Sequence, residues 1–217
     1  MQALTFAPKE KGPYRVLCLG AHCDDIEIGC GGTIIRLARE FKDLALHWVV
    51  FCSTEERKRE AAACAELFLK GVREKHVIIK EYRDGFLPYH AIEVKEFFEE
   101  LKKEVSPDLI LTHHDVDRHQ DHRLISELTW NTWRNNLILE YEIAKYDGDL
   151  GTPNFFVPLS AADFRTKADH IVATFASQRS KHWFSTDTFM ALARLRGMES
   201  CAPEHLAEAY YARKVVL

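Results

Sequence analysis

The sequence has no clustered run of lysine or arginine, and its 29 basic residues are outnumbered by 33 acidic ones, which gives a net charge of -4. It therefore lacks the basic surface that nucleic-acid binding normally requires. No stretch approaches the roughly 18 apolar residues of a membrane-spanning helix, and the first residues lack the basic start and long apolar segment of a signal peptide. We expect a cytoplasmic protein that binds neither nucleic acid nor a membrane.

Paired cysteine motifs and linkers are absent as well. The six cysteines form no C-x-x-C pair and fall mostly in apolar segments, which is typical of reduced, buried thiols rather than of a disulfide framework. No repeat, low-complexity tract or Pro/Gly/Ser-rich linker interrupts the 217 residues, of which 47% are apolar and 29% charged. One globular domain of ordinary size, covering residues 1–217, is predicted.

What the chain does contain is an alternation of short apolar runs and longer segments of helical period. The expected strands cover residues 15–21, 45–52, 76–80, 108–112 and 208–216. The expected helices cover residues 32–41, 54–69, 92–104, 121–133 and 161–175. This order predicts an α/β fold: a Rossmann-like, mostly parallel sheet covered by helices on both faces.

Acidic and histidine side chains gather directly after two of the expected strands. One cluster follows residues 15–21 and comprises His22, Asp24, Asp25 and Glu27. The other follows residues 108–112 and comprises His113, His114, Asp115, Asp117, His119, Asp121 and His122. Because open α/β sheets bind ligands beyond the carboxyl ends of their strands, adjacent strand ends would bring the two clusters together.

These residue types in this spacing point to a metal ion. His22 and Asp25 are three residues apart in a tight turn, close enough to hold one cation, and the run 119–122 can supply a second imidazole. Two histidines and one carboxylate with an open position for water is the arrangement of catalytic zinc. So many carboxylates and imidazoles at one strand edge would otherwise repel or desolvate one another, which a cation relieves.

The glycines at positions 29, 31 and 32 follow the acidic turn but do not form the GxGxxG pattern of a dinucleotide-binding loop. We interpret them as positions where the next helix packs closely against the sheet.

The two clusters also carry a resemblance to a known family. AHCDDIEIGCGGT resembles the AHPDDxE…GG signature of the LmbE/PIG-L family of zinc-dependent N-deacetylases, and DRHQDHR resembles its HxDH signature. Weaker similarities to the family's RxxE helix, DG turn and C-terminal motifs lie at Arg57 and Glu60, Asp84-Gly85, Pro153-Asn154 and Ser177-Gln178. Cys23 departs from the pattern, because the family usually has proline there and cysteine lacks the ring that fixes φ in the turn.

The resemblance implies a role for each residue of the signatures. The metal ligands would be His22, Asp25 and His122, with zinc as the metal and Fe(II) as an alternative in cells, since the same ligands accept it. Asp24 would be the general base, His119 the acid or oxyanion stabiliser, and Asp121 the residue that orients His119. Beyond the signatures, Arg57 and Asp84 are candidate contacts to the hydroxyl or phosphate groups of a substrate.

The expected reaction is hydrolysis of the acetamide of an N-acetylated amino sugar, such as an N-acetylglucosamine derivative, or of a related small amide. Zinc can polarise the carbonyl and lower the pKa of water to about 7, while Asp24 takes a proton from the attacking water. His119 in its protonated form would stabilise the oxyanion and donate a proton to the departing nitrogen. The partner is then a small N-acetylated molecule. The sequence leaves open which one, and whether the chain forms a homo-oligomer.

Two alternatives remain at this point. Two histidines and a carboxylate are also the facial triad of non-haem Fe(II) oxygenases, although those enzymes use β-sandwich scaffolds rather than alternating strands and helices. The other alternative is a catalytically inactive metal- or sugar-binding homologue, which Cys23 suggests and the presence of Asp24 and His119 argues against.

Overall fold

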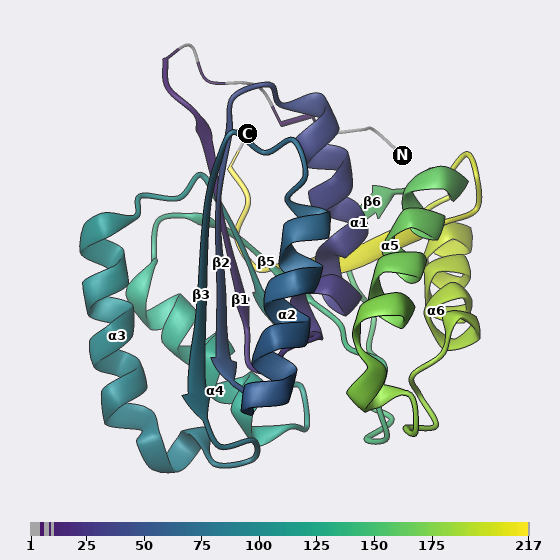
Figure 1. Ribbon diagram of the computed structural model, residues 1–217. Helices are drawn as coiled ribbons and strands as arrows, with labels where there is room; N and C mark the ends of the chain where they lie inside the picture. Colours follow the sequence, from purple (N-terminus) through teal and green to yellow (C-terminus); the bar gives the residue numbers. More distant parts are fainter. Residues whose placement is uncertain (1–4, 7–8, 10, 217) are drawn as a thin grey trace.

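The computed structural model describes residues 5–6, 9 and 11–216, which form a seven-stranded sheet between two layers of helices (Figure 1). The order of the strands in the sheet is β3-β2-β1-β4-β5-β7-β6. Their bounds are β1 Tyr14–Gly20, β2 Leu44–Cys52, β3 Glu74–Tyr82, β4 Leu109–His113, β5 Leu137–Tyr141, β6 Phe155–Pro158 and β7 Ala207–Ala212. The first five strands are parallel, whereas β7 runs antiparallel to both of its neighbours.

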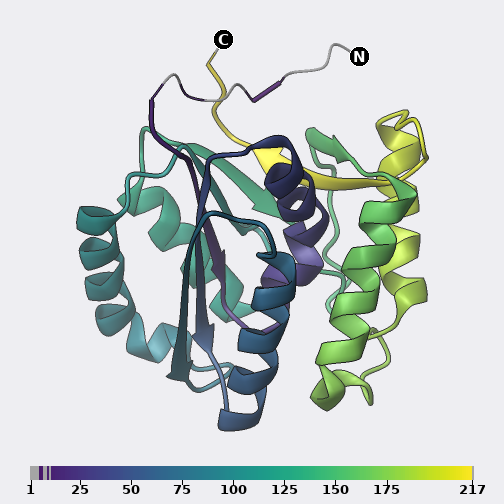
Figure 2. The ribbon, with the colours of Figure 1, turned by 45° about the horizontal axis from the view of Figure 1, so that its top comes forward.

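The helices divide between the two faces of the sheet. Their bounds are α1 Asp25–Glu40, α2 Glu55–Phe68, α3 Ala91–Glu104, α4 Gln120–Thr132, α5 Ala161–Thr174 and α6 Thr186–Glu199, with short 3-10 helices η1 Leu87–His90 and η2 Ala176–Gln178. Helices α3 and α4 cover one face, and α1, α2, α5 and α6 lie on the other (Figures 1 and 2). The predicted fold class, a mostly parallel α/β sheet with helices on both faces, is confirmed.

Strand β1 shows why the central strands consist of nearly continuous apolar residues. Val16 and Cys18 belong to the core beneath α1 and α2, while Leu17 and Leu19 belong to the core beneath α3 and α4, and all four are fully buried. A strand buried on both faces has no polar side to alternate with, which is the pattern of parallel sheets.

The glycines of α1 pack closely, as interpreted from the sequence. A Cβ at Gly29 would lie 2.2 Å from the ring of Tyr141, and one at Gly31 would lie 2.5 Å from the ring of Phe68. Helix α1 therefore approaches the sheet and α2 more closely than a chain with larger residues at these positions would allow.

Some predicted boundaries were wrong. Helix α1 begins at Asp25 rather than residue 32, because its glycine-rich start is held by packing that a propensity argument does not include. The closing strand ends at Ala212 rather than residue 216, where its antiparallel pairing with β5 and β6 ends. Strands β5 and β6 and helix α6 had not been assigned at all.

Five of the six cysteines are buried, Cys201 is exposed, and all six are free thiols. Among the described residues, no helix combines the length and the apolar character needed to cross a membrane.

The strand order also determines where a ligand site can form. From β1 the chain crosses to β2 on one side, and later enters β4 on the other side of β1, so the connections diverge between β1 and β4. The carboxyl ends of these two strands are where doubly wound sheets bind ligands. Both polar clusters identified in the sequence follow these two strand ends.

Candidate metal centre

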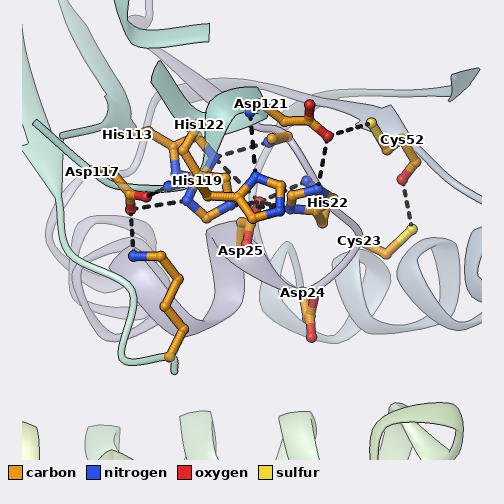
Figure 3. Close-up of polar contacts among 12 residues, drawn as sticks. His22, Cys23, Asp24, Asp25, Cys52, His113, Asp117, His119, Asp121 and His122 are labelled. Atoms are coloured by element: carbon orange, nitrogen blue, oxygen red, sulfur yellow. Dashed lines mark hydrogen bonds and ion pairs between the residues drawn. The ribbon is translucent and has the colours of Figure 1, made fainter. Parts of the chain in front are cut away.

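The structure brings three predicted ligand atoms into one triangle (Figure 3). His22 Nδ1 lies 3.0 Å from His122 Nε2 and 3.2 Å from Asp25 Oδ2, and His122 Nε2 lies 3.4 Å from the same carboxylate oxygen. His22 follows β1, Asp25 opens α1, and His122 lies in the first turn of α4. A tetrahedral ion with bonds of about 2.0–2.2 Å holds its ligand atoms roughly 3.3–3.6 Å apart, so the triangle fits one zinc-sized ion closely.

The opposite nitrogen of each histidine fixes which atom faces the triangle. His22 Nε2 lies 3.1 Å from Asp84 Oδ1 and 3.3 Å from Asp121 Oδ2, and His122 Nδ1 lies 2.9 Å from Asp117 Oδ2. Donation of these N–H groups to carboxylates leaves the facing nitrogens with bare lone pairs. This carboxylate–histidine arrangement is typical of ligands that bind a metal ion.

The electrostatics of the triangle call for a cation. Burial alone lowers the pKa of His22, but Asp25, Asp121 and Asp84 outweigh it and hold that pKa well above its usual range. Burial alone raises the pKa of Asp25, yet His122, His22 and His113 hold it well below its usual range. Two lone pairs and a carboxylate facing one another therefore need a proton or a metal ion between them.

His113, the last residue of β4, competes with His22 as a ligand. Its Nε2 lies 3.2 Å from Asp25 Oδ2, and Asp25, His113 and His122 also place their ligand atoms within 4.8 Å of one another. However, His113 Nε2 accepts the backbone N–H of Ala21 at 2.9 Å, so its lone pair is already engaged. The geometry favours His22 as the ligand and His113 as a buried support beneath it.

His119 occupies the open side of the triangle. As the N-cap of α4 it accepts the backbone N–H of Asp121 at Nδ1, 3.3 Å away, which places its own proton on Nε2. Burial, together with the charges of His22 and His122, lowers the pKa of His119, and about a quarter of its side chain is exposed. Near neutral pH it therefore presents a neutral N–H donor beside the ligands.

Asp24 faces away from the rings in the view of Figure 3 and pairs with Arg57, whose guanidinium donates to its Oδ1 at 2.7 Å. Its Oδ2 is buried and has no hydrogen-bond partner among the described residues. Burial raises the pKa of Asp24 and outweighs the charge of Arg57. Arg57 also approaches Asp84, with a nitrogen–oxygen distance of 3.7 Å. Both residues predicted to contact substrate thus lie at the centre, but only Asp84, at 60% side-chain exposure, is open to solvent.

The Asp121 carboxylate holds a loop. It accepts the backbone N–H of Gly85 at 2.7 Å and that of Leu87 at 3.1 Å, which fixes the turn carrying Asp84 next to His22. Asp121 contacts the His119 ring through its backbone N–H, which donates to Nδ1 of His119, rather than through its carboxylate.

Asp117 is one of several residues in the two clusters for which neither the pattern nor the resemblance predicts a role. Besides His122, its carboxylate accepts the backbone N–H of His119 at 2.8 Å and the ammonium of Lys145 at 2.9 Å. Burial raises its pKa, but His122, His113 and Lys145 hold it well below the usual range. Asp117 stood in the second cluster, so its position was a signal, whereas Lys145 belongs to no pattern in the sequence.

Comparison with known proteins adds a family to this geometry. The model of the family described as "PIG-L: GlcNAc-PI de-N-acetylase" matches residues 17–133, which include both clusters. An uncharacterized deacetylase, YaiS, of Escherichia coli strain K12 is 30% identical over an alignment of 150 residues. The match covers 64% of this chain and 77% of YaiS. The chain belongs to the PIG-L family.

Solved structures with the same fold extend beyond the segment that matches the family model. An N,N'-diacetylchitobiose deacetylase from Pyrococcus horikoshii superposes with a TM-score of 0.67 at 21% identity, covering 92% of this chain and 83% of that one. The 4-carboxy-2-hydroxymuconate hydratase GalB of Pseudomonas putida KT2440 superposes with a TM-score of 0.69 at 16% identity, covering 94% and 97% of the two chains. Since this fold also serves a hydratase, the fold of a PIG-L family member does not define its reaction.

Two of the weaker family motifs contact each other. Glu60 of α2 accepts the backbone N–H of Ser177 at 2.9 Å and its hydroxyl at 2.5 Å, which ties the RxxE helix of this PIG-L family member to the C-terminal motif.

Cys23, in place of proline, is fully buried and donates its thiol to the carbonyl of Cys52 at 3.3 Å. Burial raises the pKa of Cys23 to about 12, and among the described residues its sulfur belongs to none of the groups whose possible ligand atoms lie close together.

Proposed function

We propose that the protein is a metal-dependent N-deacetylase that removes the acetyl group from an N-acetylated amino sugar or a related small amide. The observation that carries this proposal is the triangle of His22, Asp25 and His122, open on the side where His119 presents its N–H. Structural zinc sites are closed by four protein ligands, whereas catalytic sites leave a position free. Family membership supports the reaction, and the names of relatives that act on acetylated sugars support the substrate class.

The metal we propose is zinc, with Fe(II) as the alternative in cells. When bound, the ion polarises an amide carbonyl and lowers the pKa of a water molecule to about 7. An amide needs this activation because its carbonyl is a weak electrophile and an amine is a poor leaving group.

The chain's own residues supply the remaining parts of the reaction. Asp24, whose Oδ2 has no hydrogen-bond partner within the described residues, accepts a proton from the attacking water. As water attacks the carbonyl carbon, negative charge develops on the carbonyl oxygen, and His119 donates a hydrogen bond from Nε2 to that oxygen. The proton released by water replaces the acyl group on the departing nitrogen, so acetate and a free amine leave. Because the pKa of His119 is lowered, oxyanion stabilisation by the neutral ring suits the site better than donation from an imidazolium.

The predicted substrate contacts divide into two roles. Asp84 is exposed beside His119, which supports a role in accepting a hydrogen bond from a sugar hydroxyl group. Arg57 is largely buried and engaged with Asp24, so we assign it to holding that carboxylate.

The proposal is tested by stripping purified protein with a chelator and restoring Zn²⁺, or Fe²⁺ without oxygen, before measuring acetate release. The substrates are N-acetylglucosamine, its β-linked disaccharide and a lipid-linked N-acetylglucosamine. We expect metal-dependent acetate release, and loss of both metal and activity in His22→Ala. The control is His90→Ala, an exposed histidine outside the cluster.

Three outcomes would contradict the proposal. Full zinc occupancy in His22→Ala would overturn the ligand set. Oxygen consumption without acetate release would favour the oxygenase alternative, whose β-sandwich scaffold this α/β fold does not share. Metal binding without turnover of any acetamide would favour an inactive homologue.

A further inference from the structure

A second group of metal-binding side chains lies on β2 and β3, away from the catalytic cluster. His47 of β2 and His76 of β3 are register partners in neighbouring parallel strands, so their side chains lie on the same face of the sheet. That face is the one covered farther along the strands by α3 and α4. Strand β3 is an edge strand, and Glu74 and His76 near its start are exposed (Figure 1).

The three side chains bring one possible ligand atom each close together. The rings of His47 and His76 are stacked, with centroids 4.5 Å apart and planes 9° from parallel. Glu74 Oε1 lies 3.1 Å from His76 Nε2, and the three residues place one ligand atom each within 4.8 Å of one another.

We propose that His47, Glu74 and His76 form a second metal site, which binds a divalent transition-metal ion such as Zn²⁺, Ni²⁺ or Cu²⁺. Two imidazoles and one carboxylate are the donors that these ions prefer, and they disfavour Mg²⁺ or Ca²⁺, which prefer oxygen ligands alone. Because Glu74 and His76 are exposed, water completes the coordination, and the site binds more weakly than the buried triangle.

The two sites are independent by distance. His47 precedes Cys52 by five residues of strand, roughly 17 Å at about 3.3 Å per residue. Cys52, at the end of β2, contacts Asp121 of the catalytic cluster, with a sulfur–oxygen distance of 3.8 Å. A metal ion at His47 therefore lies well away from the catalytic cluster, toward the start of β2.

Burial and the neighbouring charges favour an unprotonated His47 ring. Burial lowers the pKa of His47, His76 and Arg15 lower it further, and Glu74 alone opposes them. Arg15, on the neighbouring strand β1, also repels a cation, whereas Glu74 attracts it. A neutral imidazole is the form that binds a metal, so binding needs little displacement of protons near neutral pH.

The test is a calorimetric titration of the zinc-loaded protein with Ni²⁺ at neutral pH. We expect wild type to bind about one equivalent of Ni²⁺ at this site. In His76→Ala the affinity for that Ni²⁺ should be about tenfold or more lower, and in Glu74→Gln the loss of affinity should be smaller. His47→Gln is a second ligand variant, since His47 is partly buried and its alanine variant risks misfolding. His90→Ala is the matched control, because His90 is an exposed histidine beside a glutamate, Glu93, and belongs to no such group.

The variants also separate this site from the catalytic one. His76→Ala should keep wild-type acetate release. The Ni²⁺ titration therefore tests the second site even if the protein releases no acetate, and acetate release tests the proposed function even if no Ni²⁺ binds at His76. Ni²⁺ binding in His76→Ala and His47→Gln equal to that of wild type would overturn the second site, as would the absence of any binding that these substitutions reduce.

Discussion

The two oxygens of the Asp24 carboxylate have different surroundings: Oδ1 is held by Arg57, and Oδ2 is buried with no hydrogen-bond partner in the part of the chain that the structure describes. Asparagine has the same shape and can still accept from Arg57, but it cannot take a proton from water. We therefore expect Asp24→Asn to keep its metal and to lower kcat about 10²- to 10⁴-fold. Elemental analysis and acetate release measure the two effects separately.

The matched control for Asp24→Asn is Asp43→Asn, which removes an exposed carboxylate that pairs with Arg73. It should leave both quantities unchanged. Loss of metal from Asp24→Asn would make Asp24 a ligand and leave the base unidentified.

We expect Asp117 to act on the proposed metal ion through His122, which it holds by a hydrogen bond. Its carboxylate fixes the His122 ring by accepting from Nδ1, and it also holds the backbone of His119. Asparagine would weaken the basicity and orientation of the ligand, so we expect Asp117→Asn to lower metal affinity about 10- to 100-fold. Competition with a chromogenic zinc chelator measures this affinity.

Asp149→Asn is the control for Asp117→Asn, because Asp149 shares Lys145 with Asp117 but does not contact His122. If both variants lose zinc to the same extent, the lysine pair rather than the His122 contact would determine affinity. Restored turnover of Asp117→Asn at saturating zinc would confirm that Asp117 positions a ligand and does not itself react.

At the scale of helices and strands, the start of α1 carries the site, and its glycines control how closely it approaches the sheet. A Cβ at Gly29 would lie 2.2 Å from the Tyr141 ring, whose hydroxyl donates to the carbonyl of Leu19 in β1. We expect Gly29→Ala to destabilise the fold by about 1–3 kcal/mol, since an overpacked core must shift. Urea unfolding measures this loss, and the shift should also lower zinc affinity through Asp25.

Gly31→Ala tests the same reasoning against a different neighbour, because its Cβ would meet Phe68 of α2 at 2.5 Å. It should destabilise the fold without the additional loss of zinc affinity expected for Gly29→Ala. Wild-type stability in both variants would contradict the close-packing interpretation.

The sequence predicted those elements whose pattern is set locally. The central strands were predictable because both of their faces are buried, which leaves a continuous apolar run. Strand β6 is only four residues long, and α6 has little apolar periodicity in TDTFMALARLRGME, so no clear local signal marks these two elements. Strand β5, LILEY, begins with the same apolar LIL as the predicted β4, and its absence from the predicted strands was an error of interpretation. Likewise, the meeting of His22 with His122 could be predicted from the strand ends, whereas the contact of Asp117 with Lys145 depends on a loop path that no motif encodes.

At the scale of the whole molecule, much of the buried charge is concentrated at one end of the sheet, and stability should therefore depend on pH. His113 is fully buried, and burial with the charge of His122 lowers its pKa to about 4. His22 and His122 have raised pKa values and contribute in the opposite sense, so wild type alone would report a sum. A variant that removes only the titration of His113 isolates its part.

His113→Gln is such a variant, because the amide oxygen can still accept the N–H of Ala21 but does not titrate. The ordinary pKa of histidine is about 6.5, so between pH 6.5 and 4 the unfolded chain binds a proton at His113 that the folded chain does not. Stability must then fall as the pH falls through this window, by up to about 3 kcal/mol relative to the glutamine variant. Urea unfolding of both metal-free proteins at pH 7.5 and pH 4.5 measures the difference. If wild type and His113→Gln lost the same unfolding free energy between these two pH values, the His113 ring would have to take up a proton within the fold. His113 would then again be a candidate metal ligand.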